Sequence, residues 1–192
     1  EEDLKLTENT QPAILTTETG FFRLLEEKGV RPDFVAGHSL GEYAGLVAAR
    51  ALPFAQAVSL VRRRGMYMQE AVPDGQGAMA AILGMDADSV ESVCELAREG
   101  EVVSAANMNS PKQVVIAGHR TAVERAVPLA KKAGARRAIM LPVSAPFHCS
   151  LMLPAEERLS RDLDKIDFGD LDFPLISNVD ASAVRKGETA RR

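Results

Sequence analysis

Ser39 lies in the run GHSLG, residues 37–41, which fits the pattern G-x-S-x-G. The apolar run before it, 33–37, is typical of a buried strand, and the residues after it have the apolar spacing of a helix. A sharp strand-to-helix turn lifts a serine hydroxyl out of a sheet, and glycines on both sides avoid crowding where strand and helix cross. Helix N–H groups beginning at Leu40 would point to where an oxyanion forms during acyl transfer. The pattern predicts that Ser39 is a nucleophile, although on its own it is equally typical of a glycine-rich turn.

A serine hydroxyl attacks poorly at neutral pH unless a base takes its proton. The chain has three histidines. His38 is a poor candidate because adjacent residues at such a turn point apart, and His119 falls in a polar turn where a surface position is expected. His148, in PVSAPFHCSLM, follows a predicted strand late in the chain, in the serine-first order of α/β hydrolases. His148 is therefore the candidate base, while a purely structural role is equally consistent with its position taken alone.

The elements that must position Ser39 are mostly helical. Apolar periodicity predicts helices and strands on both sides of a central segment. The expected helices are 12–30, ending near Gly29, then 39–52, 53–72 and 152–166, and the expected strands are 33–37 and 173–179. The charged tail, 185–192, is expected to be surface or frayed chain.

The central segment begins at Gly77 and has a different pattern. Its expected strands are 77–83, 101–109, 113–119 and 136–143, and its expected helices are 86–99, starting on an Asp cap, and 121–134. Pro128 should lie in the first turns of the second helix or kink it. The order β-α-β-β-α-β is the ferredoxin-like arrangement. We therefore predict an α/β fold with a hydrolase-like parallel-sheet subdomain, 1–75 and 145–192, carrying Ser39, and an inserted ferredoxin-like α+β subdomain, 76–144.

Composition narrows the class of protein. With 46% hydrophobic and 26% charged residues the chain has the composition of an ordinary globular protein, and its net charge of −4 argues against nucleic-acid binding. The acidic, polar N-terminal segment is not a signal peptide, and no apolar run approaches the roughly 18 residues that span a bilayer. We expect a cytoplasmic protein with no membrane or nucleic-acid partner. Cys94 and Cys149 show no metal-ligand spacing and are expected to be buried free thiols, and no metal is predicted.

Beyond these patterns, the chain resembles the malonyl-CoA:acyl-carrier-protein transacylases of fatty-acid synthesis through most of its length. The similar segments, in that family's order, are TQPAILT, AGHSLGEYAGL, RRRGMYMQEAVP, GAMAAILG, NMNSPKQVVIAG and PVSAPFHCSLM. The resemblance implies that Ser39 attacks the thioester of malonyl-CoA while His148 takes its proton, and that the N–H of Leu40 is an oxyanion donor. The phosphopantetheine thiol of acyl carrier protein then attacks the malonyl-serine ester, in a ping-pong reaction. No resident cofactor is implied, because coenzyme A arrives with the substrate and phosphopantetheine with the partner.

The resemblance also implies residues that bind the acyl group. A malonyl carboxylate requires a cation, for which a bidentate arginine is well suited, and the matching position is Arg64. Helical geometry puts Arg63 opposite the apolar face and both Arg62 and Arg64 on its flanks, so geometry alone does not choose between the last two. Gln11 matches a glutamine near the malonyl site, although by sequence it could merely start a helix.

Three further positions match residues around the family's acyl cleft. Asn107 and Asn109 match asparagines that line it, but are equally typical of the turn before Ser110–Pro111. Phe147, beside the candidate base, is expected to narrow the pocket against α-branched acyl groups.

The resemblance does not extend to the family's two ends. Family members begin with a strand and a Gly-Gln-Gly loop that supplies a second oxyanion amide, and continue to a residue whose carbonyl orients the histidine. Since neither matches within 1–192, we expect a fragment that is weakly active or inactive alone. Two alternatives remain: a serine hydrolase or thioesterase that uses water as acceptor, and an inactive fragment that only binds carrier protein.

Overall fold

The computed structural model describes residues 2–73, 75–143 and 145–191. The chain forms two compact units, one made of Glu1–Met66 with Arg158–Arg192 and the other of Tyr67–Glu157. Residues 67–75 and 145–157 therefore belong to the second unit, whereas the sequence prediction gave them to the subdomain that carries Ser39. The predicted domain boundaries, 1–75 with 145–192 for the hydrolase-like subdomain and 76–144 for the inserted one, remain a prediction.

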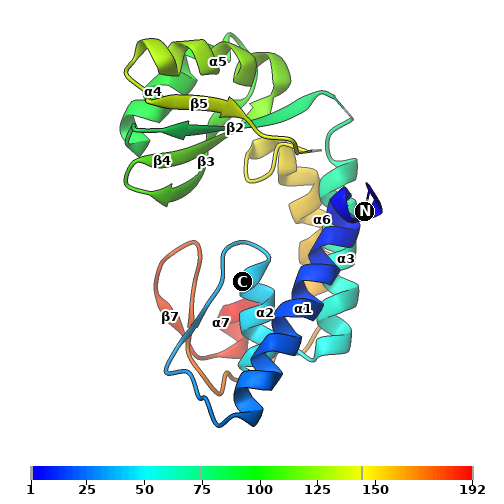
Figure 1. Cartoon of the computed structure of the whole chain (residues 1–192). Helices are drawn as coiled ribbons and strands as arrows, with labels where there is room; N and C mark the ends of the chain where they lie inside the picture. The colour runs from blue at the N-terminus through cyan, green and yellow to red at the C-terminus, as the bar shows by residue number, and fades with distance from the viewer. Residues whose placement is uncertain (1, 74, 144, 192) are drawn as a thin grey trace. The chain divides into compact units, whose positions relative to one another are not determined.

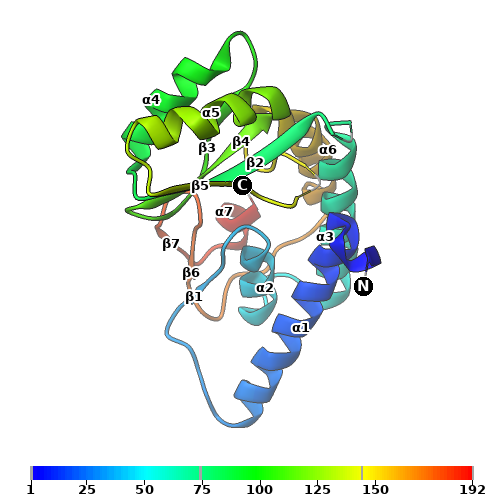
Figure 2. The same cartoon turned by 45° about the horizontal axis from the view of Figure 1, so that its top comes forward.

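The first unit combines helices with a small sheet. Its elements are η1 (Glu2–Lys5), α1 (Thr7–Glu27), β1 (Val35–Ala36), α2 (Gly41–Ala48), most of α3 (Phe54–Glu70), most of α6 (Leu153–Leu163), β6 (Leu175–Ile176), β7 (Ala183–Val184) and α7 (Gly187–Arg191). The strand order is β1-β6-β7, with β1 parallel to β6 and β6 antiparallel to β7 (Figure 2). The expected helices and strands are present, and the α/β class with a parallel strand pair is confirmed.

Helices α1 and α3 approach each other closely. Helix α1 begins at Thr7, five residues before the predicted start at Pro12, so this proline lies inside the helix. At Gly65 of α3, an added Cβ would lie 2.5 Å from the Cα of Glu8 in α1, which leaves room only for glycine. The contact fixes how the neighbouring side chains of the two helices, among them Gln11 and Arg64, face one another.

The end of the chain, expected to be surface or frayed, is at the surface but is not frayed: Lys186 and Glu188 are exposed, and the segment is helical. Residues Gly187–Arg191 form α7, where a Cβ on Gly187 would lie 2.3 Å from the carbonyl oxygen of Phe168. Ala190 packs against the hydrophobic core of the first unit, and Lys186 pairs with Asp170 at 2.6 Å. Within the described residues, the tail is therefore ordered by backbone packing that a charged composition does not reveal.

The second unit is a four-stranded antiparallel sheet with two helices. Its elements are β2 (Gly77–Leu83), α4 (Ala87–Arg98), β3 (Val103–Ser110), β4 (Gln113–His119), α5 (Arg120–Lys132), β5 (Arg137–Met140) and η2 (Ser150–Met152). The strand order β3-β4-β2-β5, with every pair antiparallel, confirms the ferredoxin-like arrangement (Figure 1). Pro128 lies in the interior of α5 and not in its first turns, which was one of the two predicted positions.

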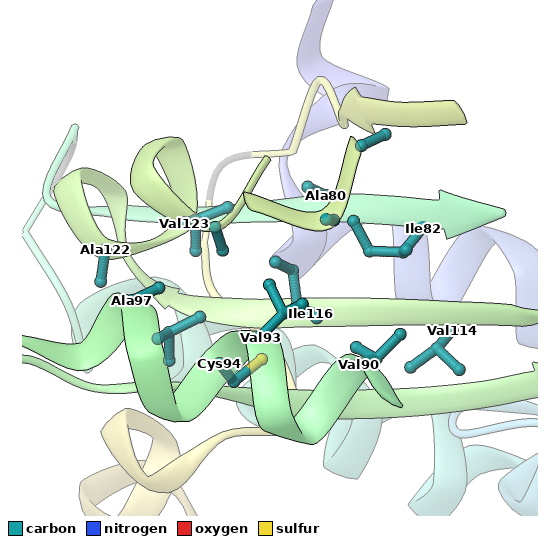
Figure 3. Close-up of a cluster of buried hydrophobic side chains, with 14 of the residues drawn as sticks. Ala80, Ile82, Val90, Val93, Cys94, Ala97, Val114, Ile116, Ala122 and Val123 are labelled. Carbon is teal, nitrogen blue, oxygen red and sulfur yellow. The ribbon is translucent and has the colours of Figure 1, made fainter. Parts of the chain in front are cut away.

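The core of this unit lies between the sheet and helices α4 and α5. Figure 3 shows Ile82, Val114 and Ile116 of the strands facing Val90 and Val93 of α4. Helix α4 starts as predicted, since the carboxylate of Asp86 accepts the N–H of Ser89 at 3.0 Å. Hydrogen bonds to Ser89 are the main reason that the pKa of Asp86 falls to about 2, so the cap stays ionised well into the acid range.

Both cysteines are free thiols. Cys94 is buried in the core of the second unit and Cys149 is half-buried. Burial raises the pKa of both, that of Cys94 to about 12, so neither thiol ionises near neutral pH. No helix in the described part of the chain could cross a membrane. Across residues 2–73, 75–143 and 145–191, no cluster of three or more His, Cys, Asp or Glu side chains could hold a metal ion.

Candidate active site

Ser39 occupies a strained turn between β1 and α2. Its φ of 54° lies in the left-handed region, which a residue with a side chain adopts only when its surroundings enforce it. The strand ends at Ala36 and the helix begins at Gly41, so the reversal takes only four residues. The structure therefore gives Ser39 the backbone of a nucleophile elbow.

The two glycines of GHSLG are not equivalent. A Cβ on Gly37 would lie 1.9 Å from the carbonyl carbon of Gly41, so any side chain there would collide with the start of α2. A Cβ on Gly41 would meet nothing within 4 Å. The sequence prediction that crowding demands glycine on both sides of Ser39 is thus right for Gly37 and wrong for Gly41.

Arg64 of α3 joins Ser39 to Gln11 of α1. Its Nη2 donates to Ser39 Oγ at 3.0 Å, and its Nη1 donates to Gln11 Oε1 at 2.6 Å. Gln11 is buried and its own amide donates to Thr7 Oγ1 at 3.0 Å. The guanidinium is therefore held from one side by α1 and faces the hydroxyl on the other.

The neighbouring arginines have other positions. Arg63 donates to the carboxylate of Asp162 in α6 at 2.8 Å, and Arg62 is exposed. Helical geometry left both Arg62 and Arg64 as candidates for contact with Ser39. In the structure Arg64 makes that contact.

Tyr43, which the sequence interpretation did not select, also contacts Arg64. The guanidinium carbon lies 5.6 Å from the centroid of the tyrosine ring, a cation–π distance. Burial raises the pKa of Tyr43, an effect opposed by the charge of Arg64. Tyr43 comes four residues after Ser39, one helical turn along α2, and that spacing could have identified it.

Asn178 and Glu42 were missed as well. The side-chain Oδ1 of Asn178 accepts the backbone N–H of Ser39 at 2.8 Å, and the backbone N–H of Asn178 donates to Glu42 Oε1 at 2.7 Å. Asn178 follows β6, the parallel neighbour of β1. A short apolar run does not reveal its pairing partner, so sequence reasoning had no basis for bringing Asn178 to Ser39.

Leu40 completes the residues of the first unit that were predicted for the site. Its side chain is buried in the core. Leu40 directly precedes Gly41, the first residue of α2, and its own φ and ψ are already helical. Ser39, Leu40, Gln11 and Arg64 thus all lie in the first unit, where Arg64 contacts both Ser39 and Gln11.

The remaining predicted residues belong to the second unit. His148 is exposed and, like Ser39, has a left-handed backbone, with φ of 59°. Phe147 packs partly against two small apolar clusters of that unit. Asn107 and Asn109 both lie in β3, the first half-buried and the second exposed, rather than in the turn that follows.

The fold and the elbow place the chain among α/β proteins that present a serine at a strand-to-helix turn. The family described as "Acyl transferase domain" matches residues 1–191. The malonyl CoA-acyl carrier protein transacylase of Bacillus subtilis is 54% identical over 184 residues, covering 95% of this chain and 58% of that protein. The chain belongs to the acyl transferase domain family.

Solved structures agree with this assignment. The malonyl CoA-acyl carrier protein transacylase from Coxiella burnetii matches with a TM-score of 0.97 and 50% identity, over 100% of this chain and 61% of that one. A malonyl-transacylase in complex with its type II PKS acyl-carrier protein matches with a TM-score of 0.96 and 48% identity, over 99% of this chain and 62% of that one. The chain therefore spans 58% to 62% of the length of these relatives.

Proposed function

We propose that the protein moves a malonyl group from malonyl-CoA to the phosphopantetheine thiol of acyl carrier protein, as an S-malonyltransferase of cytoplasmic fatty-acid biosynthesis. The observation that carries the proposal is the guanidinium of Arg64, 3.0 Å from the hydroxyl of Ser39. A cation at this place suits an acyl group with a free carboxylate. The printed names of the similar proteins describe the same activity.

In the proposed reaction Ser39 is the nucleophile and His148 the base. The Oγ of Ser39 attacks the thioester carbonyl as the imidazole of His148 takes its proton, and the carbonyl oxygen becomes an oxyanion. The backbone N–H of Leu40, at the start of α2, donates to that oxyanion. The C–S bond then breaks, the proton passes to the coenzyme A sulfur, and a malonyl ester remains on Ser39. In the second half of the reaction the carrier-protein thiol attacks the malonyl-serine ester while His148 takes the thiol proton. The bond from the acyl carbon to Ser39 Oγ then breaks, and His148 returns the proton to Ser39 Oγ.

Arg64 binds the far carboxylate of the malonyl group. Once Oγ carries the ester, the carboxylate lies only a methylene beyond the ester carbonyl, within reach of the guanidinium fork. Gln11 and Tyr43 hold Arg64 from other directions, so its donors are already oriented when the substrate arrives. A hydrolase or thioesterase could use the same arrangement with water as the acceptor, so the relative rates of hydrolysis and of transfer to the carrier thiol distinguish the two functions.

The residues of the second unit have supporting roles in the proposal. The proposed role of Asn107 and Asn109 is contact with the acyl group, and that of Phe147 is to limit branching at the α-carbon of the acyl group. A lone binding role for the chain, without chemistry, remains the other alternative.

Incubation with malonyl-CoA followed by intact-protein and peptide mass spectrometry tests the proposal. We expect an adduct of malonyl mass on the peptide that contains Ser39, none in Ser39→Ala, and much slower formation in His148→Ala. Adding holo acyl carrier protein should move the adduct to the carrier faster than it is hydrolysed. Rapid release of free malonate would favour the hydrolase, and carrier binding without any adduct would favour the non-catalytic alternative.

A further inference from the structure

We propose that Asn178 is a positioning residue for Ser39: it holds the strained elbow in the conformation that aims the hydroxyl at Arg64. This inference rests on the proposed function only for its kinetic consequence. Its structural part depends on the contacts of Asn178 with Ser39 and Glu42 alone.

The hydrogen bond to Ser39 acts on the torsion that is strained. The N–H of Ser39 lies in the peptide plane that joins it to His38, and φ of Ser39 is the rotation between that plane and the rest of the residue. Asn178 Oδ1 holds the plane from one side at 2.8 Å, while α2 holds the residues that follow, with Glu42 N–H bonded to the carbonyl of Ser39 at 3.2 Å. With both sides held, φ stays at 54° and the direction of the Cα–Cβ bond, from which the hydroxyl extends, is set.

Asn178 is itself held in two ways. Its backbone N–H donates to Glu42 Oε1 at 2.7 Å. The elbow and the segment after β6 therefore each supply one donor and one acceptor to the other. Its loop is closed by bonds from Ser177 N–H to Ser182 and from Ala181 N–H to Ser177, both of 2.9 Å. The acceptor oxygen is thus fixed relative to the elbow before any substrate binds.

The sheet explains why this pair meets. Strands β1 and β6 run parallel, with Ala36 paired to Ile176, so the two chains leave the sheet at the same carboxyl edge. Ser39 comes three residues after Ala36, and Asn178 comes two residues after Ile176. The side-chain amide of Asn178 therefore reaches the elbow from the end of β6, the strand next to β1. Its contact is with the backbone of Ser39 and not with the guanidinium of Arg64.

The test compares Asn178→Ala, Asn178→Gln and Asn178→Asp in the protein at its full natural length. Alanine removes the acceptor, glutamine displaces it by one methylene, and aspartate keeps an oxygen at the same place. Ser177→Ala is the matched control, because it removes the Ser177 Oγ acceptor that takes the N–H of Asp180 in the same loop and leaves the elbow bonds intact.

We expect Asn178→Ala to slow formation of the malonyl adduct on Ser39 about 10- to 100-fold, as a displacement of about 1 Å can, with kcat lowered and KM little changed. Asn178→Gln should also slow adduct formation, whereas Asn178→Asp and Ser177→Ala should keep most of the wild-type rate. If the alanine variant does not fold, the contrast between glutamine and aspartate carries the comparison.

Two readouts do not depend on malonyl transfer. Hydrogen exchange of the Ser39 amide should accelerate in Asn178→Ala and not in Ser177→Ala, and sulfonylation of Ser39 by phenylmethylsulfonyl fluoride should slow in parallel. Wild-type protein that takes no malonyl would contradict the proposed function alone, because exchange at Ser39 still reports on Asn178. Wild-type exchange and wild-type acylation in folded Asn178→Ala would overturn the positioning role.

Discussion

Arg64 has three contacts that a lysine could not reproduce together. One nitrogen donates to Ser39 Oγ, another to Gln11 Oε1, and the guanidinium plane lies near the ring of Tyr43. A lysine ammonium is a compact charge without the planar fork that pairs with a carboxylate. The site therefore requires an arginine for its shape as much as for its charge.

Replacing Arg64 should change which acyl group is accepted. We expect Arg64→Ala to lower kcat/KM for malonyl loading about 30- to 100-fold, since hydrogen bonds to a charged group contribute roughly 1.5–3 kcal/mol. Arg64→Lys should recover only part of this loss. Loading from acetyl-CoA, which lacks the carboxylate, should be far less affected.

The measurement is the ratio of malonyl to acetyl adducts formed on Ser39, followed by mass spectrometry. Arg62→Ala is the matched control, because Arg62 is the neighbouring arginine and is exposed. An unchanged ratio in Arg64→Ala would show that the guanidinium does not select the acyl group.

At this scale, the G-x-S-x-G pattern predicted Ser39 and the helix N–H groups that begin at Leu40, because a motif of consecutive residues carries that information. Gln11 and Arg64 were selected by the family resemblance, since helical spacing alone did not choose between Arg62 and Arg64. Asn178 was missed because its role depends on strand pairing between segments that are 139 positions apart. Whether His148 acts as the base stays a prediction that kinetics must test.

At the scale of elements, two short pieces of structure hold the elbow. Strand β1 has only two residues, yet its register with β6 determines where both following loops begin. Helix α2 starts directly beneath Gly37, so strand and helix touch through backbone atoms. The turn thus depends on the absence of a side chain at Gly37 rather than on a strong local preference of the sequence for a turn.

The two glycines of the elbow should respond differently to the same substitution. Gly37→Ala forces a Cβ into the backbone of α2, and we expect it to lower the free energy of unfolding by about 3 kcal/mol or more and to abolish loading of Ser39. Gly41→Ala meets no neighbour within 4 Å and should leave stability unchanged or raise it by at most about 1 kcal/mol, since alanine favours a helix.

Urea unfolding of both variants, monitored by circular dichroism, provides the comparison. Equal losses at the two positions would mean that the elbow tolerates no side chain on either side. A stable Gly37→Ala protein would contradict the close backbone approach.

Element boundaries were predictable only in part. The helices and the long strands of the second unit follow apolar periodicity, which burial on one face enforces. Helix α7 was not predicted, because Gly187 is selected by its approach to Phe168 and not by any local pattern. The early start of α1 was missed because the apolar spacing was followed only from Pro12 onward, whereas the helix begins at Thr7 and Pro12 lies inside it.

At the scale of the whole molecule, the two units have separate hydrophobic cores. The core of the second unit is built from small and β-branched side chains on the sheet and on helices α4 and α5, among them the fully buried Ile82 and Ile116 (Figure 3). The core of the first unit gathers residues of α1, α2, α3 and β6. Each unit therefore has its own source of stability.

Truncating a central side chain should destabilise the second unit. Ile116 is fully buried, and we expect Ile116→Ala to lower the free energy of unfolding by about 3 kcal/mol through lost burial and the resulting cavity. Leu96→Ala is the matched control on α4, because its side chain is 71% exposed, and it should change stability by less than about 0.5 kcal/mol.

Chemical denaturation measured by far-ultraviolet circular dichroism gives both values. Similar midpoints for Ile116→Ala and the wild type would mean that the packing around β4 does not hold the unit together.

The division of the chain also bears on its synthesis by the ribosome. The second unit is one uninterrupted stretch, so all its partners have emerged once residue 157 leaves the exit tunnel. The elbow, by contrast, is translated before the second unit but must wait for β6 and Asn178, which follow that unit in the sequence. Because distant pairings form slowly and domains assemble as units, Ser39 reaches the geometry seen here only after the second unit and β6 have both been synthesised.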